Sequence, residues 1–381
     1  MKQINILQII SSKDATGGSQ EHTRILCAGL DKNKYRVIVV TRPGSIVPYY
    51  KEQGFEVIPV ELRHNPGSIL KLLDIIKRYK IHIIHTHNML ADRRGCVAGW
   101  LGRVPIVVTT IHTLMNTDRF GEEKRGTSIW QYNFLLKHVP KKIIVLSKEV
   151  KRHTQNELNL GEDRISLIYN ASDLSRLNLS VNKQEKKREF GIDENCCVVG
   201  TVGRLVELKG YPYLIKAASL ILQKFPKKLK FLIVGDGYMA DELRNLANGL
   251  GIADKIIFAG QRRDVPEILH ILDIFVLTSY YEGLPRSIIE AQACGVAVVA
   301  TNVGGTPEVV INDKTGILVP TKDEKAIAKA VIDLLTNKDK ARRMGNTGRE
   351  WAKKQFDAPV FIKRTEDLFE DLIRKHIPDV A

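Results

Sequence analysis

Short apolar runs typical of β-strands alternate with stretches whose apolar residues recur at helical spacing, and this pattern occurs twice along the chain. In the first half, the strand-like runs lie at residues 4–10, 36–41, 55–60, 81–85, 104–111 and 142–146, with helical stretches at 19–30 and 69–79. In the second half they lie at 198–202, 230–234, 255–258, 274–277 and 296–300, and a last helical stretch spans 360–375. Such alternation predicts parallel βαβ units in doubly wound sheets.

The second start of the pattern predicts two domains, which agrees with a length of 381 residues. Residues 180–189 are polar and highly charged, as expected of a connection between domains. We expect a first domain at 1–180, a second at 181–358 and a final helical segment at 359–381. Two doubly wound sheets side by side leave a cleft at the carboxyl ends of their strands, where ligands bind in this architecture.

The composition excludes several other classes of protein. Hydrophobic residues make up 44% and charged residues 27% of the chain, as in ordinary globular proteins. No apolar run approaches the roughly 18 residues of a membrane span, and the polar residues within 1–10 are unlike a signal peptide. The five cysteines, an odd number without a Cys-x-x-Cys pair, favour buried thiols over disulfides or a zinc site. We therefore expect a cytoplasmic protein.

Most of the positive charge lies in the first half of the chain. Residues 1–190 carry a net charge of +13 out of the total of +15, and residues 191–381 carry +2. A basic surface suits nucleic acid, an acidic substrate or an anionic membrane face, or is simply solvated. The sequence has no zinc-finger spacing, basic heptads or aromatic RNA-binding motif, so we expect no nucleic-acid partner.

The first candidate site follows the strand at 198–202, where Gly203 and Arg204 precede Lys209. A glycine at a strand end lets the backbone approach a ligand. A guanidinium and an ammonium group are the usual means of holding phosphate oxygens. At the carboxyl end of a strand, these three residues predict a phosphate site.

After the strand at 230–234, the sequence Gly235-x-Gly237-x-x-Ala240 imitates the fingerprint of dinucleotide-binding proteins. The acid that would bind the ribose is absent, because residues 259–263 at the end of the next strand contain no Asp or Glu. The motif also opens the second βα unit of its domain and not the first. These departures disfavour a nicotinamide-dependent oxidoreductase and leave a turn that faces a phosphate or a sugar. We assign Gly235 and Arg262 to nucleotide binding.

The most specific motif joins the strand at 274–277 to a helix. Pro285 suits the first position of that helix, so Glu282 lies in the loop and Glu290 on the helix, about 7.5 Å along the axis from Pro285. The amides of Gly283 and Leu284 precede the helix, where an anion is stabilised. A carboxylate, two amides and a second carboxylate, in this order, suit a sugar, a diphosphate and a ribose.

Two glycine pairs and several histidines complete the candidates. Gly17-Gly18 follows the first strand and Gly304-Gly305 follows the strand at 296–300, so both pairs are expected to line the cleft. Histidines near the strands of the first half are His82, His85, His87 and His112. Three histidines together would suit a metal, but no carboxylate accompanies them at ligand spacing. We predict structural, hydrogen-bonded histidines, no metal site, and a substrate contact for His112.

Together, these motifs resemble those of the retaining glycosyltransferases of family four, which have the GT-B fold of two Rossmann-like domains facing across a cleft. The resemblance extends over nearly the whole chain. It implies that Gly17-Gly18 faces the phosphates of the donor, that Arg204 and Lys209 hold its diphosphate, and that His112 contacts the transferred sugar.

The same resemblance assigns Glu282 to the donor sugar and Glu290 to the ribose, and it implies that the final helix crosses back to the first domain. The chain departs from the family pattern at two places. Gln20 and then Glu21 stand where the family usually has an acid after the glycine pair, so no role is transferred to either residue. Residues 168–173 resemble the Pro-Asn-Gly-Val-Asp segment between the domains, with Tyr, Ala and Ser in place of Pro, Gly and Val.

The reaction that the resemblance implies is transfer of a sugar from a UDP- or GDP-sugar to a hydroxyl of a glycan, glycolipid or lipid-linked acceptor. It proceeds with retention of configuration and without a bound metal or other cofactor. The acceptor would bind the first domain, whose charge suits an anionic membrane face. Two alternatives stay open: a nucleotide-sugar isomerase, epimerase or phosphorylase of the same fold, and, with less support, an NAD-dependent oxidoreductase.

Overall fold

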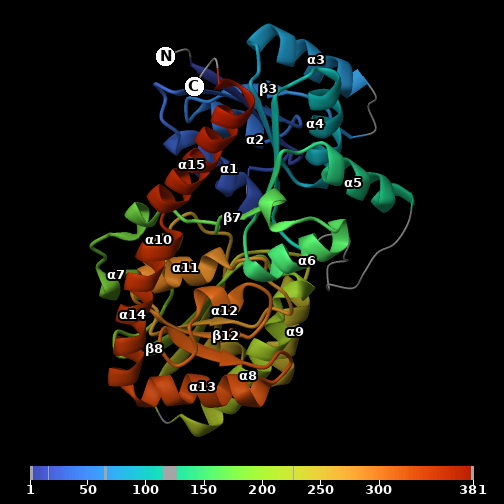
Figure 1. The fold of residues 1–381 in the computed structure, drawn as a ribbon. Helices are drawn as coiled ribbons and strands as arrows, with labels where there is room; N and C mark the ends of the chain where they lie inside the picture. Colours follow the sequence, from blue (N-terminus) through green and yellow to red (C-terminus); the bar gives the residue numbers. More distant parts are fainter. Residues whose placement is uncertain (1–2, 16, 64–66, 115–126, 226, 379–381) are drawn as a thin grey trace. The chain divides into compact units, whose positions relative to one another are not determined.

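The computed structural model describes residues 3–15, 17–63, 67–114, 127–225 and 227–378 (Figure 1). The chain forms two compact units. Unit 1 comprises residues 1–171 together with 358–381, and unit 2 comprises residues 172–357. Among the described helices, none combines the length and the apolar character that a membrane crossing requires.

Unit 1 is a seven-stranded parallel sheet with helices between its strands. Its strands are β1 (Ile4–Ile10), β2 (Tyr35–Thr41), β3 (Glu56–Pro59), β4 (Ile83–His87), β5 (Ile106–Ile111), β6 (Lys142–Val145) and β7 (Ile165–Leu167). Its helices are α1 (Gly18–Gly29), α2 (Ile46–Lys51), α3 (Gly67–Tyr79), α4 (Met89–Leu101), α5 (Thr127–His138), α6 (Lys148–Leu158) and α15 (Ala358–His376).

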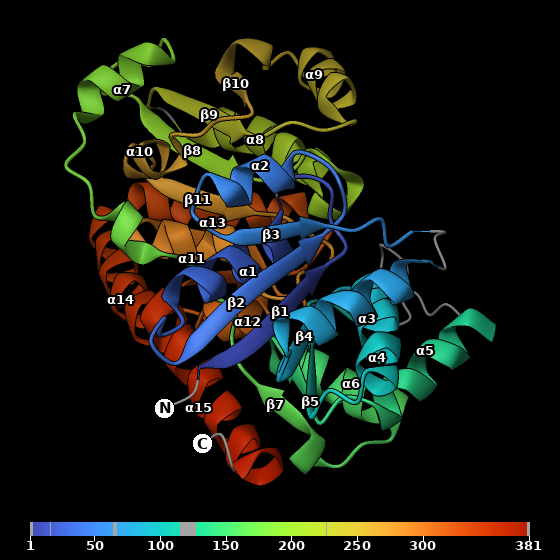
Figure 2. The same ribbon diagram turned by 90° about the horizontal axis from the view of Figure 1, so that it is seen from above.

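The strand order of unit 1 is β3-β2-β1-β4-β5-β6-β7, and β1, β2 and β3 are seen side by side in Figure 2. Strands β1, β4 and β5 are almost completely buried because helices cover both faces of a doubly wound sheet. The C-terminal helix α15 belongs to this unit. It runs beside α1 and buries Phe361 and Phe369 in the same cluster as Ile6 and Ile83 of the sheet (Figure 1).

Unit 2 is a six-stranded parallel sheet of order β10-β9-β8-β11-β12-β13. Its strands are β8 (Cys197–Val202), β9 (Leu229–Val234), β10 (Ile256–Gly260), β11 (Ile274–Leu277), β12 (Ala297–Thr301) and β13 (Gly316–Val319). Its helices are α7 (Lys183–Glu189), α8 (Tyr211–Lys224), α9 (Ala240–Gly249), α10 (Val265–His270), α11 (Arg286–Ala293), α12 (Thr306–Val309), α13 (Glu324–Thr336) and α14 (Lys338–Phe356).

The prediction of two doubly wound parallel sheets is confirmed. Strands β7 and β13 were not expected, because each is a short edge strand of three or four residues. The units divide between Ala171 and Ser172, inside the segment 168–173 and not near residue 180. The charged residues expected as a connection form helix α7 of unit 2, capped by the side chain of Asn182.

Candidate functional site

In each unit, the strand order reverses between two neighbouring strands. Ligands of open α/β sheets bind at the carboxyl ends of the strands at such a switch point. In unit 2 these strands are β8 and β11, which pair directly. The loop after β8 carries Arg204 and Lys209, and the loop after β11 carries Glu282. The topology therefore brings the two strongest sequence motifs to one point of the sheet.

The loops at this end of unit 2 are bonded to one another through their backbones. Tyr280 N donates to Leu208 O at 2.8 Å, and Leu205 N donates to Asp236 O at 2.9 Å. Gly305 N donates to Glu282 O, also at 2.9 Å. The loops that follow β8, β9, β11 and β12 thus form one connected framework around the predicted donor site.

Two glycines make this framework possible. Gly235 has φ +134°, and a Cβ there would collide with the carbonyl oxygen of Gly203. Gly304 has φ +52°, and a Cβ there would collide with the carbonyl oxygen of Glu282. The glycines of the dinucleotide-like motif and of the second glycine pair are therefore required by contacts between loops.

The carboxylate of Glu282 is held by two residues of unit 2. Its Oε1 accepts hydrogen bonds from Lys209 Nζ at 2.5 Å and from Ser279 Oγ at 2.6 Å. The side chains of Lys209 and Glu282 are 19% and 12% exposed, so the ion pair is largely shielded from solvent. Within the described chain, Oε2 of Glu282 has no such partner, which leaves one carboxylate oxygen for a ligand.

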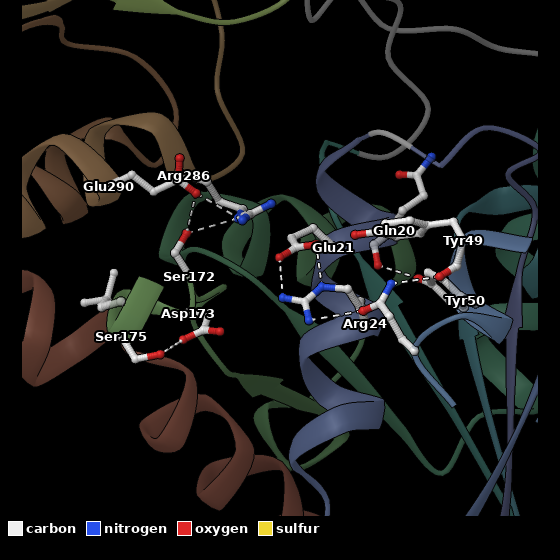
Figure 3. A network of polar contacts seen from close by, with 12 residues as sticks. Gln20, Glu21, Arg24, Tyr49, Tyr50, Ser172, Asp173, Ser175, Arg286 and Glu290 are labelled. Atoms are coloured by element: carbon white, nitrogen blue, oxygen red, sulfur yellow. Dashed lines mark hydrogen bonds and ion pairs between the residues drawn. The ribbon is translucent and has the colours of Figure 1, made fainter. Parts of the chain in front are cut away.

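Glu290 is arranged in the same way, one turn inside α11. Its Oε1 accepts hydrogen bonds from Ser172 Oγ at 2.9 Å and Arg286 at 3.1 Å, as Figure 3 shows. Neither of these contacts uses Oε2, which among the described residues is left to accept a hydrogen bond from a ligand hydroxyl. The predicted helix start was wrong by one residue, because Pro285 is the N-cap of α11 and not its first helical residue. Gly283 and Leu284 are buried immediately before it.

Arg204 and Arg262 differ in their surroundings. Arg204 is exposed in the loop after β8, and no contact with another described residue engages its guanidinium. Arg262 forms ion pairs with Asp264 and Glu189, and its guanidinium lies over the ring of Phe190. The structure therefore does not group Arg262 with the other predicted donor residues, because neighbouring carboxylates already satisfy its charge.

In unit 1, the first glycine pair opens helix α1 after β1. Gly17 is the N-cap with φ +144°, a conformation that favours glycine, and Gly18 is the first helical residue. The side-chain amide of Gln20 donates to Ser12 Oγ. The backbone oxygen of Gln20 accepts a hydrogen bond from the hydroxyl of Tyr50 (Figure 3). Glu21 pairs with Arg24 on the next turn. The pair therefore presents a helix N-terminus, with the two following polar side chains bonded within unit 1.

The predicted histidine His112 lies directly after β5 and is half-buried. Its Nε2 is 3.4 Å from Nδ1 of His87, and the ring of His22 packs edge-on at 4.9 Å between centroids. Burial, with the neighbouring imidazoles, holds the pKa of His112 and His87 well below the usual range. Burial also lowers the pKa of His85 to about 3. These rings are therefore neutral near pH 7.

Several residues of the two sites were not found by sequence reasoning. Ser279, Ser172 and Arg286 orient the two glutamates, and His22 joins His87 and His112. Arg286 lies between Glu282 and Glu290, and Ser279 lies three residues before Glu282, so both could have been suspected from the sequence. Ser172 and His22 are far from their partners in sequence, and the chain alone gives no signal for those contacts.

Comparison with known proteins gives the family. The family described as Glycosyltransferase Family 4 matches residues 16–176, and the family described as Glycosyl transferases group 1 matches residues 182–351. An Escherichia coli protein named UDP-Gal:alpha-D-GlcNAc-diphosphoundecaprenol alpha-1,3-galactosyltransferase is 30% identical over 321 residues, which cover 82% of this chain and 81% of that protein. The N-acetyl-alpha-D-glucosaminyl L-malate synthase of Bacillus anthracis is 26% identical over 80% of this chain and 78% of that protein.

Solved structures agree on the fold. A glycosyltransferase from Rickettsia africae ESF-5 superposes with a TM-score of 0.86 at 23% identity, covering 98% of this chain and 100% of that one. Anabaena Alr3699/HepE in complex with UDP-glucose superposes with a TM-score of 0.85 at 20% identity, covering 97% and 100%. The expected fold and family are both confirmed. The chain belongs to glycosyltransferase family 4, and it is a glycosyltransferase of the GT-B fold that uses a nucleotide-sugar donor.

Proposed function

We propose that the protein transfers a sugar from a UDP-sugar to a hydroxyl of a lipid-linked glycan, with retention of configuration and without a metal ion. The observation that carries this proposal is the pair Lys209–Glu282 at the carboxyl ends of β8 and β11, beside the exposed Arg204. An ammonium has three donors, so Lys209 can keep Glu282 and still bind a phosphate oxygen.

The residues of unit 2 supply the charge that the leaving group needs. As the bond to the sugar breaks, negative charge develops on the diphosphate, and fixed cations at that point lower the barrier. Arg204 and Lys209 fill this role in the proposal, with the amides of Gly283 and Leu284 as further donors. The free oxygens of Glu282 and Glu290 accept hydrogen bonds from hydroxyls of the donor sugar and of the ribose. His112 of unit 1 contacts the transferred sugar.

The choice of donor and acceptor follows the named relatives. The Escherichia coli relative is named for UDP-galactose and for an acceptor linked to diphosphoundecaprenol. A Staphylococcus aureus relative, 25% identical over 91% of this chain, is named as a capsular polysaccharide biosynthesis glycosyltransferase. We therefore extend the proposal to UDP-hexoses and to an acceptor that carries a diphosphate-linked lipid.

Such an acceptor lies at a membrane, and unit 1 has a surface that suits one. Along α5, the ring of Trp130 stacks on that of Phe134, which in turn contacts the tilted ring of His138. Trp130 and Phe134 are 69% and 53% exposed. Helix α4, which packs between α3 and α5, adds the exposed Trp100 and Leu101. Aromatic side chains of this kind are enriched where proteins meet lipid headgroups. We propose peripheral binding to the inner face of a membrane.

Basic residues in or near loops of the first domain are expected to contact an anionic surface: Arg93, Arg94, Arg103, Arg119, Lys124 and Arg125. Those that the structure describes differ in their surroundings. Arg93 lies over the ring of Tyr132, and Arg94 donates to Leu62 O, so both are half-buried. Arg103 is exposed. The other expected residues, Arg119, Lys124 and Arg125, lie outside the residues that the structure describes. The exposed aromatics are therefore the better targets for a test of membrane binding.

The activity is tested with UDP-galactose, UDP-glucose and UDP-GlcNAc and a short-chain prenyl diphosphate GlcNAc acceptor. We expect one donor to give a glycosylated lipid whose new bond keeps the donor's anomeric configuration by NMR. Glu282→Gln should abolish transfer, whereas Glu242→Gln, an exposed glutamate on α9, should not. Turnover of the donor without acceptor would favour an isomerase, and a requirement for inorganic phosphate would favour a phosphorylase.

Membrane binding is tested by sedimentation with vesicles that contain anionic lipid. Replacing Trp130 and Phe134 together by Ser should reduce the bound fraction severalfold, and Leu250→Ser on unit 2 should leave it unchanged. Binding should also weaken at 1 M salt, where the screening length is about 3 Å. Absence of binding by the wild-type protein at low salt would make a soluble acceptor the better proposal.

A further inference from the structure

Three histidines of unit 1 converge from three different elements. His22 lies on α1, His87 ends β4, and His112 follows β5. One ring nitrogen of each lies within 4.8 Å of a ring nitrogen of both others. His22 and His87 are buried, and His112 is half-buried. Sequence spacing does not reveal this cluster, because His22 is 65 positions from the next member in the chain.

The outer nitrogen of His22 is fixed by a carboxamide. Its Nδ1 is 3.0 Å from Oδ1 of Asn170, and the same oxygen accepts the backbone N–H of Ala171 at 3.0 Å. Since this oxygen receives a backbone donor, it acts as an acceptor, and Nδ1 of His22 must carry the hydrogen. The lone pair of a neutral His22 ring is then on Nε2.

The outer nitrogen of His87 also faces a carboxamide. Its Nε2 is 2.8 Å from Oε1 of Gln8, a buried residue of β1. When Nε2 of His87 donates to this oxygen, the lone pair of His87 is on Nδ1, the atom that lies 3.4 Å from Nε2 of His112. Metal-binding histidines characteristically donate their other N–H to an oxygen acceptor, which fixes the ring and its tautomer.

We propose that His22, His87 and His112 bind a divalent transition-metal ion of the Zn²⁺ type. At zinc–nitrogen distances of about 2.0–2.1 Å, tetrahedral ligand atoms lie about 3.3 Å apart. The nitrogens of His87 and His112 already have nearly this separation, and a modest rotation of the rings closes the rest. Imidazole ligands without a carboxylate suit Zn²⁺, Co²⁺, Ni²⁺ or Cu²⁺ and disfavour Mg²⁺ and Mn²⁺.

This ion is not part of the proposed transfer reaction. If His112 contacts the donor sugar, as the proposed function holds, an ion bound to the same ring would compete with the donor and inhibit turnover. That consequence rests on the proposed function, but binding of the ion does not. The two are therefore separated by measuring metal binding directly.

The test uses the full-length protein, freed of metal by a chelator and titrated with Co²⁺. We expect one equivalent to give absorption bands between about 500 and 700 nm, and Zn²⁺ to remove them. His22→Gln and His112→Gln should each weaken Co²⁺ binding at least tenfold. His138→Gln, on the exposed face of α5, is the matched control and should bind as the wild type does.

Thermal unfolding followed by circular dichroism shows whether each variant is folded. Replacing the half-buried His112 should disturb the fold less than replacing the buried His22. The His112→Gln protein therefore tests the site even if His22→Gln does not fold. The proposal is overturned if the wild type gives no cobalt bands and isothermal titration calorimetry detects no binding of Zn²⁺. It is also overturned if a folded His112→Gln protein binds Co²⁺ with unchanged affinity. Loss of binding in His138→Gln would point instead to a surface histidine. Absence of transfer activity, with cobalt bands present, would count against the proposed function alone.

Discussion

Replacing Gly304 by Ala tests whether the framework of loops positions Glu282. Gly304 has φ +52°, and a Cβ at this position would lie well inside 3.0 Å of the carbonyl oxygen of Glu282. That oxygen accepts the N–H of Gly305 at 2.9 Å. The variant must therefore move the backbone of Glu282, or the loop after β12, to relieve the contact.

Two contributions determine how much stability the Gly304→Ala variant should lose. An alanine in the left-handed region costs about 1–2 kcal/mol wherever it occurs. Separating the two atoms by about 1 Å also weakens the hydrogen bond between the loops, and a net backbone hydrogen bond contributes about 1 kcal/mol. We expect the free energy of unfolding to fall by about 2–3 kcal/mol in total. Because a displacement of about 1 Å at a catalytic group can cost 10²-fold in rate, turnover should fall by about that factor.

Gly251→Ala is the matched control, because Gly251 has φ +67° but no atom lies within 4 Å of its missing Cβ. It carries the backbone strain without the collision, so it should cost about 1–2 kcal/mol and leave turnover unchanged. For a domain of this size each kcal/mol shifts Tm by about 2–4 °C, so Gly304→Ala should melt several degrees below Gly251→Ala. Equal melting temperatures and equal turnover in the two variants would refute the reasoning.

Four further results are expected. Glu282→Gln should lower turnover at least 100-fold while the affinity for UDP, measured by calorimetry, changes less than fivefold. His112→Ala should reduce turnover more than the affinity for UDP, and an equal loss of both would show that the residue is misplaced. Transfer should persist in EDTA; its loss, with recovery on adding manganese, would contradict the metal-free reaction. Burial raises the pKa of Asp92 to about 7, above a value of about 3.9 in the unfolded chain. The folded protein therefore binds the proton more tightly, and its free energy of unfolding should fall by roughly 4 kcal/mol from pH 4 to pH 7 and level off above pH 7. Asp92→Asn should remove this fall in a series of Tm values measured against pH.

The sheets could be predicted from the sequence because strands buried on both faces consist of nearly continuous apolar residues. Strands β1 and β11 begin and end at the predicted residues. The edge strand β13 follows a turn closed by Asn312 and Thr315, and only two of its four residues are fully buried, so its pattern is weak. The charge in residues 180–189, expected of a connection, belongs in part to the solvent-exposed helix α7 of unit 2, because charged residues suit an exposed helix as well as a linker.

The site was predictable at the level of single loops but not of their contacts. A residue at the end of a strand is visible in the sequence, and the doubly wound order then decides which strand ends are neighbours. The partners of each side chain depend on distances that the sequence does not contain. Lys209 and Arg262 are both basic residues in strand-end loops, yet Lys209 pairs with Glu282 and Arg262 with two carboxylates at α7 and α10.

The motif around Gly235 shows how position in a sheet decides between two chemistries. The same run of glycines serves a pyrophosphate when it follows the strand at the switch point, because the backbone then faces an open crevice. Here it follows β9, which lies between β8 and β10, while the switch point is at β8 and β11. The space beside Gly235 and Gly237 is filled by the carbonyl groups of Gly203 and Leu205. The glycines are therefore required so that the loop after β8, which carries Arg204, can pack against the loop after β9. In the proposed reaction, Arg204 and Lys209 bind the phosphates instead of the glycine motif.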